Sequence, residues 1–200
     1  MLFRSAGYAG AIESAPEELV SSHAVKRFLT AFTWPRIWLF RRLLQELLLW
    51  RLRIEKPPVI EIGIDTMVMD NDEATVRHGV EPTYKKVKGF QPLQMTCGRV
   101  IVDAVFRGGK RHGNHGDTVE RMVRHVVKNI RKGYRTDAPI IFKVDSGFFD
   151  QDLFRVFEEL DVGYVVSGRL YDDIKETVSA LPCTAWSVYR TKDQEWDYVE

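Results

Sequence analysis

The sequence has few cysteines, no marked excess of charge of either sign and no long uninterrupted hydrophobic run. Its two cysteines, Cys97 and Cys183, form neither a metal-ligand spacing nor a disulfide framework, which predicts a protein of the reducing cytoplasm. The opening residues lack an apolar core of signal-peptide length, so secretion is not expected.

Basic and acidic residues nearly balance, with 29 Lys and Arg against 28 Asp and Glu. A net charge of +1 gives no global signature of a nucleic-acid-binding protein, so any such signature has to come from local clusters. At 200 residues and 44% hydrophobic content, the chain can bury one substantial core and carry a short appendage.

The most apolar segment, residues 34–58, is interrupted by charged side chains, among them Arg36, Arg41, Arg42, Glu46, Arg51 and Arg53. This pattern excludes a membrane span. It predicts a helix that begins near Pro35 and ends before Pro57. The sequence favours a helix packed on the core with a solvated basic edge, although the arginines could also follow a phosphate backbone.

Strands and helices alternate after residue 58. Segments 59–69, 138–145 and 162–170 have the composition of strands, and 93–98 and 99–109 predict a hairpin with its turn at Gly98. Residues 70–90 are too polar for a core element. Segments 117–134 and 150–160 predict amphipathic helices, and the last segment, 183–200, alternates like a further pair of strands. The pattern predicts an α/β fold with a mixed sheet, preceded by a helical N-terminal segment.

The helix at 117–134 is the clearest in the sequence. It has one apolar stripe (Val119, Met122, Val123, Val126, Val127 and Ile130), a capping pair in Asp117 and Glu120, and a stop at Gly133. Its outward face carries six basic residues, Arg121, Arg124, His125, Lys128, Arg131 and Lys132, and is either solvated or directed at DNA.

Two aspartates follow or terminate apolar strands. Asp65 belongs to the segment 59–69, and Asp145 ends the segment 138–145 before Ser146 and Gly147. If the two strands are adjacent and parallel, both carboxylates lie at one edge of the sheet, where Mg²⁺ or Mn²⁺ could bridge them. The alternative is that each is a strand-end acid satisfied by backbone amides. Alternation places a third acid, Asp103, in an outward or edge position, outside the site.

Other residues suggest contacts with nucleic acid. Lys85, Lys86 and Lys88 lie between Tyr84 and Phe90, a mixture of cations and aromatics that suits DNA but also suits a surface turn. The glycine-rich loop 108–117 carries Lys110 and Arg111, which could follow a DNA strand. His112 and His115 in that loop are too few for a zinc site.

The succession "IEIGIDTMVMDND", "YKKVKGFQPLQMTCG", "FRGGKRHGNHGD", "IIFKVDSGFFD" and "LDVGYVVSGRL" resembles the DDE transposases of bacterial insertion sequences. The resemblance covers about residues 59–170, and the order of the motifs carries it. It implies a ribonuclease-H-like core with Asp65 and Asp145 as catalytic, metal-binding acids. The third acid of that family is a glutamate on a later helix and is expected beyond residue 200, so the chain is interpreted as a fragment.

The resemblance divides the chain into a helical N-terminal segment (1–56), an incomplete catalytic core (57–170) and the start of a β-rich insertion (171–200). It implies metal-dependent cleavage and transfer of DNA strands in cut-and-paste transposition, with transposon ends and target DNA as partners and a homodimer as one compatible assembly. Two alternatives stay open: a truncated, inactive DNA-binding remnant, and a different nuclease on the same fold, such as a resolvase.

Overall fold

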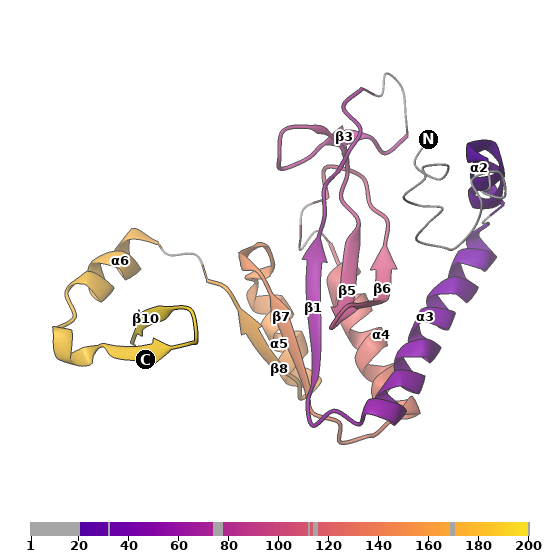
Figure 1. Cartoon of the computed structure of the whole chain (residues 1–200). Helices are drawn as coiled ribbons and strands as arrows, with labels where there is room; N and C mark the ends of the chain where they lie inside the picture. The colour runs from indigo at the N-terminus through magenta and orange to yellow at the C-terminus, as the bar shows by residue number, and fades with distance from the viewer. Residues whose placement is uncertain are drawn as a thin grey trace.

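The computed structural model describes residues 21–31, 33–73, 78–111, 113, 116–168 and 171–199 (Figure 1). The helices are α2 (Ser22–Thr30), α3 (Trp34–Glu55), α4 (Thr118–Gly133), α5 (Gln151–Glu159) and α6 (Asp172–Ser179), with 3₁₀ turns η3 (Ser146–Phe148) and η4 (Cys183–Ala185). The strands are β1 (Ile60–Thr66), β2 (Met69–Asp70), β3 (Glu81–Pro82), β4 (Lys88–Phe90), β5 (Leu93–Cys97), β6 (Val100–Val105), β7 (Ile140–Val144), β8 (Gly163–Val166), β9 (Ser187–Arg190) and β10 (Glu195–Tyr198).

Five strands form the main sheet in the order β6-β5-β1-β7-β8. The β5–β6 hairpin turns at Gly98, where φ is +60°, and β5 pairs antiparallel with β1. β1, β7 and β8 are parallel. This is the mixed sheet of an α/β fold that the sequence predicted.

One face of the main sheet carries the hydrophobic core. Ile60, Ile62 and Ile64 of β1 are buried, while Glu61 and Asp65, on the other face, are exposed. In Figure 1, α4 and α5 lie behind the sheet and α3 lies beside its β6 edge. All six residues of the predicted α4 stripe are buried. Leu153, Phe154 and Phe157 of α5 are also buried as predicted, and Leu160 is partly buried.

Helix α3 contacts the core along only part of its length. Gln45, Leu48, Leu49 and Leu52 are its buried residues, whereas apolar side chains of its first half stay exposed: Ile37, Trp38, Leu39, Phe40 and Leu43. The helix begins with Pro35 in its first turn and ends at Glu55 with Lys56 in the left-handed region, as the sequence predicted. The interpretation of α3 as a core-packed helix with a solvated basic edge is correct for its second half, which buries Leu48, Leu49 and Leu52. Its first half differs, because large apolar side chains share the exposed surface there.

The polar segment between β1 and β5 contains strands of its own. β2, β4 and β3 form a small three-stranded sheet, which the sequence did not predict. Gly89 fits there because a side chain at that position would lie 2.1 Å from the Met69 carbonyl oxygen. The small sheet directly continues β1 at the carboxyl end of the main sheet (Figure 1).

Residues 171–199 form α6 and the β9–β10 hairpin, which lie to one side of the main sheet (Figure 1). The pair of strands was predicted and α6 was not. Among the described residues, no helix is long and apolar enough to cross a membrane.

The N-terminus of α4 differs from its prediction. Asp117 occupies the N-cap position, but its side chain accepts no capping hydrogen bond and instead lies 3.6 Å from Arg121 Nη1. The physical reason is the backbone of Asp117, whose ψ of 5° differs from the extended value of a usual N-cap.

Candidate active site

Asp65 and Asp145 occupy equivalent positions on neighbouring strands. The parallel ladder between β1 and β7 pairs Ile62 with Phe142 and Ile64 with Val144. The next residue along the chain is Asp65 on one side and Asp145 on the other. Both carboxylates are exposed, and both lie at the carboxyl end of the sheet, where open α/β sheets bind ligands.

Each carboxylate is held by one backbone amide. Asp65 Oδ1 accepts from the Thr66 N–H at 2.7 Å, and Asp145 Oδ1 accepts from the Gly147 N–H at 2.9 Å. The reading of the two aspartates as strand-end acids therefore describes their local geometry correctly. It does not account for their second oxygens, for which no protein donor is found among the described residues.

A hard divalent cation suits this donor set. Mg²⁺ and Mn²⁺ bind carboxylate oxygens and keep water or phosphate oxygens as the remaining ligands, so two carboxylates with free oxygens fit such an ion. Within the described part of the chain, no group of three or more His, Cys, Asp or Glu residues lies close enough to form a complete cage. The pair can therefore supply part of a metal's coordination shell.

The turn after Asp145 packs closely against the Asp145 carboxylate. A side chain at Gly147 would begin 3.0 Å from Asp145 Oδ1, and one at Gly113 would begin 3.0 Å from the Gly147 carbonyl oxygen. The glycine-rich loop after β6 therefore packs directly against the acid-bearing turn. Two segments that are more than 30 residues apart in sequence meet there through glycine.

Arg107 is a buried residue of this region that the sequence reasoning missed. It is 4% exposed and donates from Nε to the Gln91 carbonyl at 3.1 Å and from Nη1 to the Gly113 carbonyl at 3.1 Å. Its Nη2 has no acceptor among the residues that the structure describes. Burial, with the nearby charge of Arg111, lowers the pKa of Arg107 to about 10. No carboxylate among the described residues pairs with it. The only sequence signal is an arginine between a strand and a glycine pair, which is not specific.

The predicted DNA-binding residues gather on the small sheet. Lys85 and Lys86 lie in the turn between β3 and β4, and Lys88 is exposed on β4. The loop with Lys110 and Arg111 contacts the same sheet. Gly108 forms an isolated antiparallel β-bridge with Phe90 of β4, and Lys110 Nζ lies 3.7 Å from Oε1 of Glu81 in β3. Two basic groups that are separate in sequence thus share one surface at the acid-bearing end of β1.

Asp103 does not point outward as alternation predicted. It lies on the edge strand β6, but its side chain is 0% exposed and accepts a bidentate pair from Arg41, at 2.7 Å from Nε and 2.6 Å from Nη2. The register of β5 and β6 shifts between Met95 and Thr96, so Val102 and Asp103 are both buried. The β-bulge interrupts the alternation on which the prediction depended. Asp103 stays outside the acid pair.

Two further features considered as binding sites from the sequence are the histidines of the glycine-rich loop and the basic face of α4. His112 and His115 lie outside the described residues. The basic face of α4 is used in part for structure, because Arg124 pairs with Glu120 and Glu159, and Arg131 donates to the Asp161 carbonyl.

Comparison with solved structures finds transposases. The chain is 17% identical to the piggyBac transposase in its synaptic complex with hairpin DNA, over 71% of this chain and 32% of that one, with a TM-score of 0.42. It is 10% identical to the catalytic domain of the Mos1 mariner transposase, over 70% and 71% of the two chains, with a TM-score of 0.40. The chain thus spans about a third of the piggyBac chain, and at these scores the likeness supports no further conclusion. No curated protein matches the sequence.

A family model covers nearly the whole chain. The model described as transposase DDE domain group 1 matches residues 7–200. The match includes β1 with Asp65, β7 with the following Asp145, and the loop with Arg107. The chain therefore belongs to the DDE transposase family.

Proposed function

We propose that the protein is a DNA transposase that cleaves and transfers DNA strands in cut-and-paste transposition, with Asp65 and Asp145 as metal-binding catalytic residues. The observation that carries the proposal is their placement, next to each other across a parallel ladder and each with a free carboxylate oxygen. Family membership supports the reaction class, which is phosphoryl transfer on DNA.

Asp65 and Asp145 would hold Mg²⁺ or Mn²⁺ through their carboxylates. A bound ion would supply a lower pKa for water and would neutralise charge that develops on a phosphodiester. The contribution of the chain is to hold both carboxylates in fixed positions. The Thr66 and Gly147 amides do this by each occupying one carboxylate oxygen, which leaves the other oxygen available.

The surface around the acids fits a DNA substrate. The basic residues of the small sheet, Lys85, Lys86, Lys88, Lys110 and Arg111, would contact phosphates on the side where β1 ends. Arg107 acts as a positioning residue, since its two hydrogen bonds to carbonyls hold the glycine-rich loop against the turn that carries Asp145.

The experiment is a cleavage assay with the protein and labelled DNA from both sides of its reading frame, where the ends of a mobile element would lie. We expect Mg²⁺- or Mn²⁺-dependent strand breaks that disappear in Asp65→Asn and in Asp145→Asn. Asp137→Asn is the matched control, because Asp137 is an exposed aspartate paired with Arg135. Cleavage that persists when both acids are replaced would refute the assignment.

A further inference from the structure

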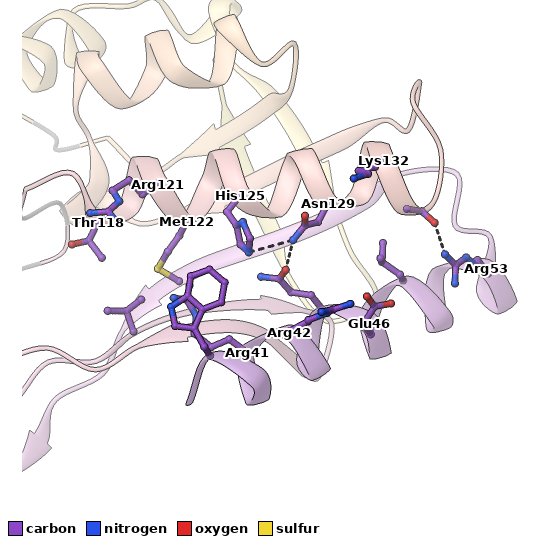
Figure 2. A pocket seen from close by; sticks show the side chains of 15 residues that line it. Arg41, Arg42, Glu46, Arg53, Thr118, Arg121, Met122, His125, Asn129 and Lys132 are labelled. Carbon is purple, nitrogen blue, oxygen red and sulfur yellow. Dashed lines mark hydrogen bonds between the residues drawn. The ribbon is translucent and has the colours of Figure 1, made fainter. Parts of the chain in front are cut away.

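A cleft of about 970 Å³ lies between α3 and α4 (Figure 2). Trp38, Arg42, Gln45 and Arg53 of α3 line one wall, and Asn129 and Lys132 of α4 belong to the other. None of these residues belongs to the acid pair or to the basic surface of the small sheet. The cleft is therefore a separate candidate for ligand binding.

The cleft carries positive charge that the protein does not neutralise. Among the described residues, Arg42 and Lys132 have no ion-pair partner, and Arg53 donates only to the Gly133 carbonyl at 2.6 Å. Glu46 is the one acidic residue in the lining. Arg41 also lines the cleft, but its guanidinium is engaged by Asp103. The lining thus has a net positive charge and suits an anionic ligand.

A buried amide in the cleft lacks an acceptor. Gln45 is 6% exposed, and its Oε1 accepts from Asn129 Nδ2, which also lies 3.3 Å from His125 Nε2. These contacts are drawn in Figure 2. Gln45 Nε2 is buried and has no hydrogen-bond partner in the described structure. Because a buried donor without an acceptor is destabilising, a ligand oxygen that accepts from Gln45 Nε2 would remove this cost.

The basic residues of the cleft are spaced too far apart to bind one small anion together. Arg42 and Arg53 are eleven residues apart on one helix (53 − 42), which corresponds to about 16 Å along its axis. Trp38 is 64% exposed at the edge of the cleft, where a base could stack on its ring. Cations spaced along a groove, a neutral donor in its floor and an aromatic ring at its edge together suit a chain of phosphates and bases.

We propose that the cleft between α3 and α4 binds a single strand of DNA, with its phosphates at Arg42, Arg53 and Lys132 and an acceptor oxygen at Gln45 Nε2. The choice of DNA over another anionic chain rests on the proposed function. The cleft would hold a segment of DNA away from the acids. An acidic protein segment is the competing occupant that the experiment has to separate.

The first test measures the anisotropy of a labelled oligothymidylate across a salt series. Arg42→Gln with Lys132→Gln should weaken binding about tenfold and reduce the slope of log K against log salt by about 1.4, because each phosphate contact on a single strand contributes about 0.7. Arg99→Gln with Lys128→Gln is the control, since it removes the same charge from exposed residues that do not line the cleft. Equal affinities for both double variants would overturn the proposal.

A second variant separates binding from folding. Gln45→Met removes the unsatisfied Nε2 donor together with the Oε1 acceptor of Asn129, and these opposite effects should leave the melting temperature nearly unchanged. The variant should weaken oligothymidylate binding about fivefold with no change in salt slope. Lower stability with unchanged affinity would show that Gln45 is only structural and would contradict its role as a DNA contact.

The same assay distinguishes the failure of this inference from that of the proposed function. Wild-type protein that binds neither oligothymidylate nor duplex DNA would refute both. Binding lost in Lys85→Gln with Lys86→Gln, but retained in the cleft variants, would refute only the cleft. A labelled polyglutamate that binds more tightly than DNA and is lost in the cleft variants would assign the cleft to an acidic protein segment instead.

Discussion

The two faces of the main sheet are built from the same strands but differ in the burial and pairing of their charged side chains. On the face covered by helices, Asp103 is fully buried and its carboxylate is held by both arms of Arg41. On the other face, Glu61 pairs with Lys143 at 2.5 Å, yet both side chains are more than half exposed. Asp65, two residues beyond Gly63 on that face, has no cation as a partner within the described part of the chain.

This difference shows where a carboxylate is structural and where it is available. A buried carboxylate without a counter-ion would cost several kcal/mol, so Asp103 is fully committed to Arg41. An exposed carboxylate is hydrated and can exchange its water for a metal ion at little cost. The acids that matter for chemistry are therefore the ones whose loss the fold should tolerate.

The largest expected effect comes from the covered face. Arg41→Met leaves the buried Asp103 carboxylate with only the Ala104 amide, and we expect a loss of about 3–5 kcal/mol in the free energy of unfolding. Chemical denaturation would measure it. The matched control is Arg42→Met, the neighbouring exposed arginine without an ion pair, which should change stability by less than about 0.5 kcal/mol. Similar effects of both variants would mean that the ion pair contributes little.

The ion pair on the open face should contribute much less. Glu61→Gln removes the attraction to Lys143 across β1 and β7, and we expect a loss of about 0.2–1 kcal/mol because solvent and salt screen the pair. A double-mutant cycle with Lys143→Met at two salt concentrations isolates this interaction. A coupling energy as large as the effect of Arg41→Met would show that the open face is covered in solution.

The smallest effect on stability is expected at the acid pair. Asp65→Asn with Asp145→Asn keeps an oxygen that can accept from the Thr66 and Gly147 amides, and it removes two like charges from neighbouring positions. The free energy of unfolding in a metal-free buffer should therefore change by less than about 0.5 kcal/mol. Thermal and chemical denaturation would test this. A loss of several kcal/mol would place these aspartates with Asp103 as structural residues.

The parts of the fold that repeat a clear period could be predicted from the sequence. The 16-residue helix α4 and the alternating isoleucines of β1 have periods that fix which residues are buried. The sequence placed Asp65 beside Asp145 only on the condition that their strands are adjacent and parallel, and the structure meets that condition. The burial of Asp103 could not be predicted, because a bulge of one residue changes the face of everything after it. Strands of two or three residues, such as β2 and β3, are too short to show alternation.

Features formed by segments that are distant in the chain could not be predicted from the sequence either. Arg107 is distinguished from other arginines only because its buried guanidinium donates hydrogen bonds to the carbonyls of Gln91 and Gly113. The cleft between α3 and α4 depends on two helices separated by about 60 residues of chain that includes most of the main sheet. In both cases the residue types are common, and only their placement distinguishes them from ordinary surface arginines and amides.

The most direct test of the central claim is calorimetric titration of the protein with Mn²⁺ and with Mg²⁺. The account predicts measurable uptake by the wild type and by Asp137→Asn, and none by Asp65→Asn with Asp145→Asn, whose fold is expected to be intact. Equal uptake by the double variant would contradict the assignment of Asp65 and Asp145 as the metal-binding acids.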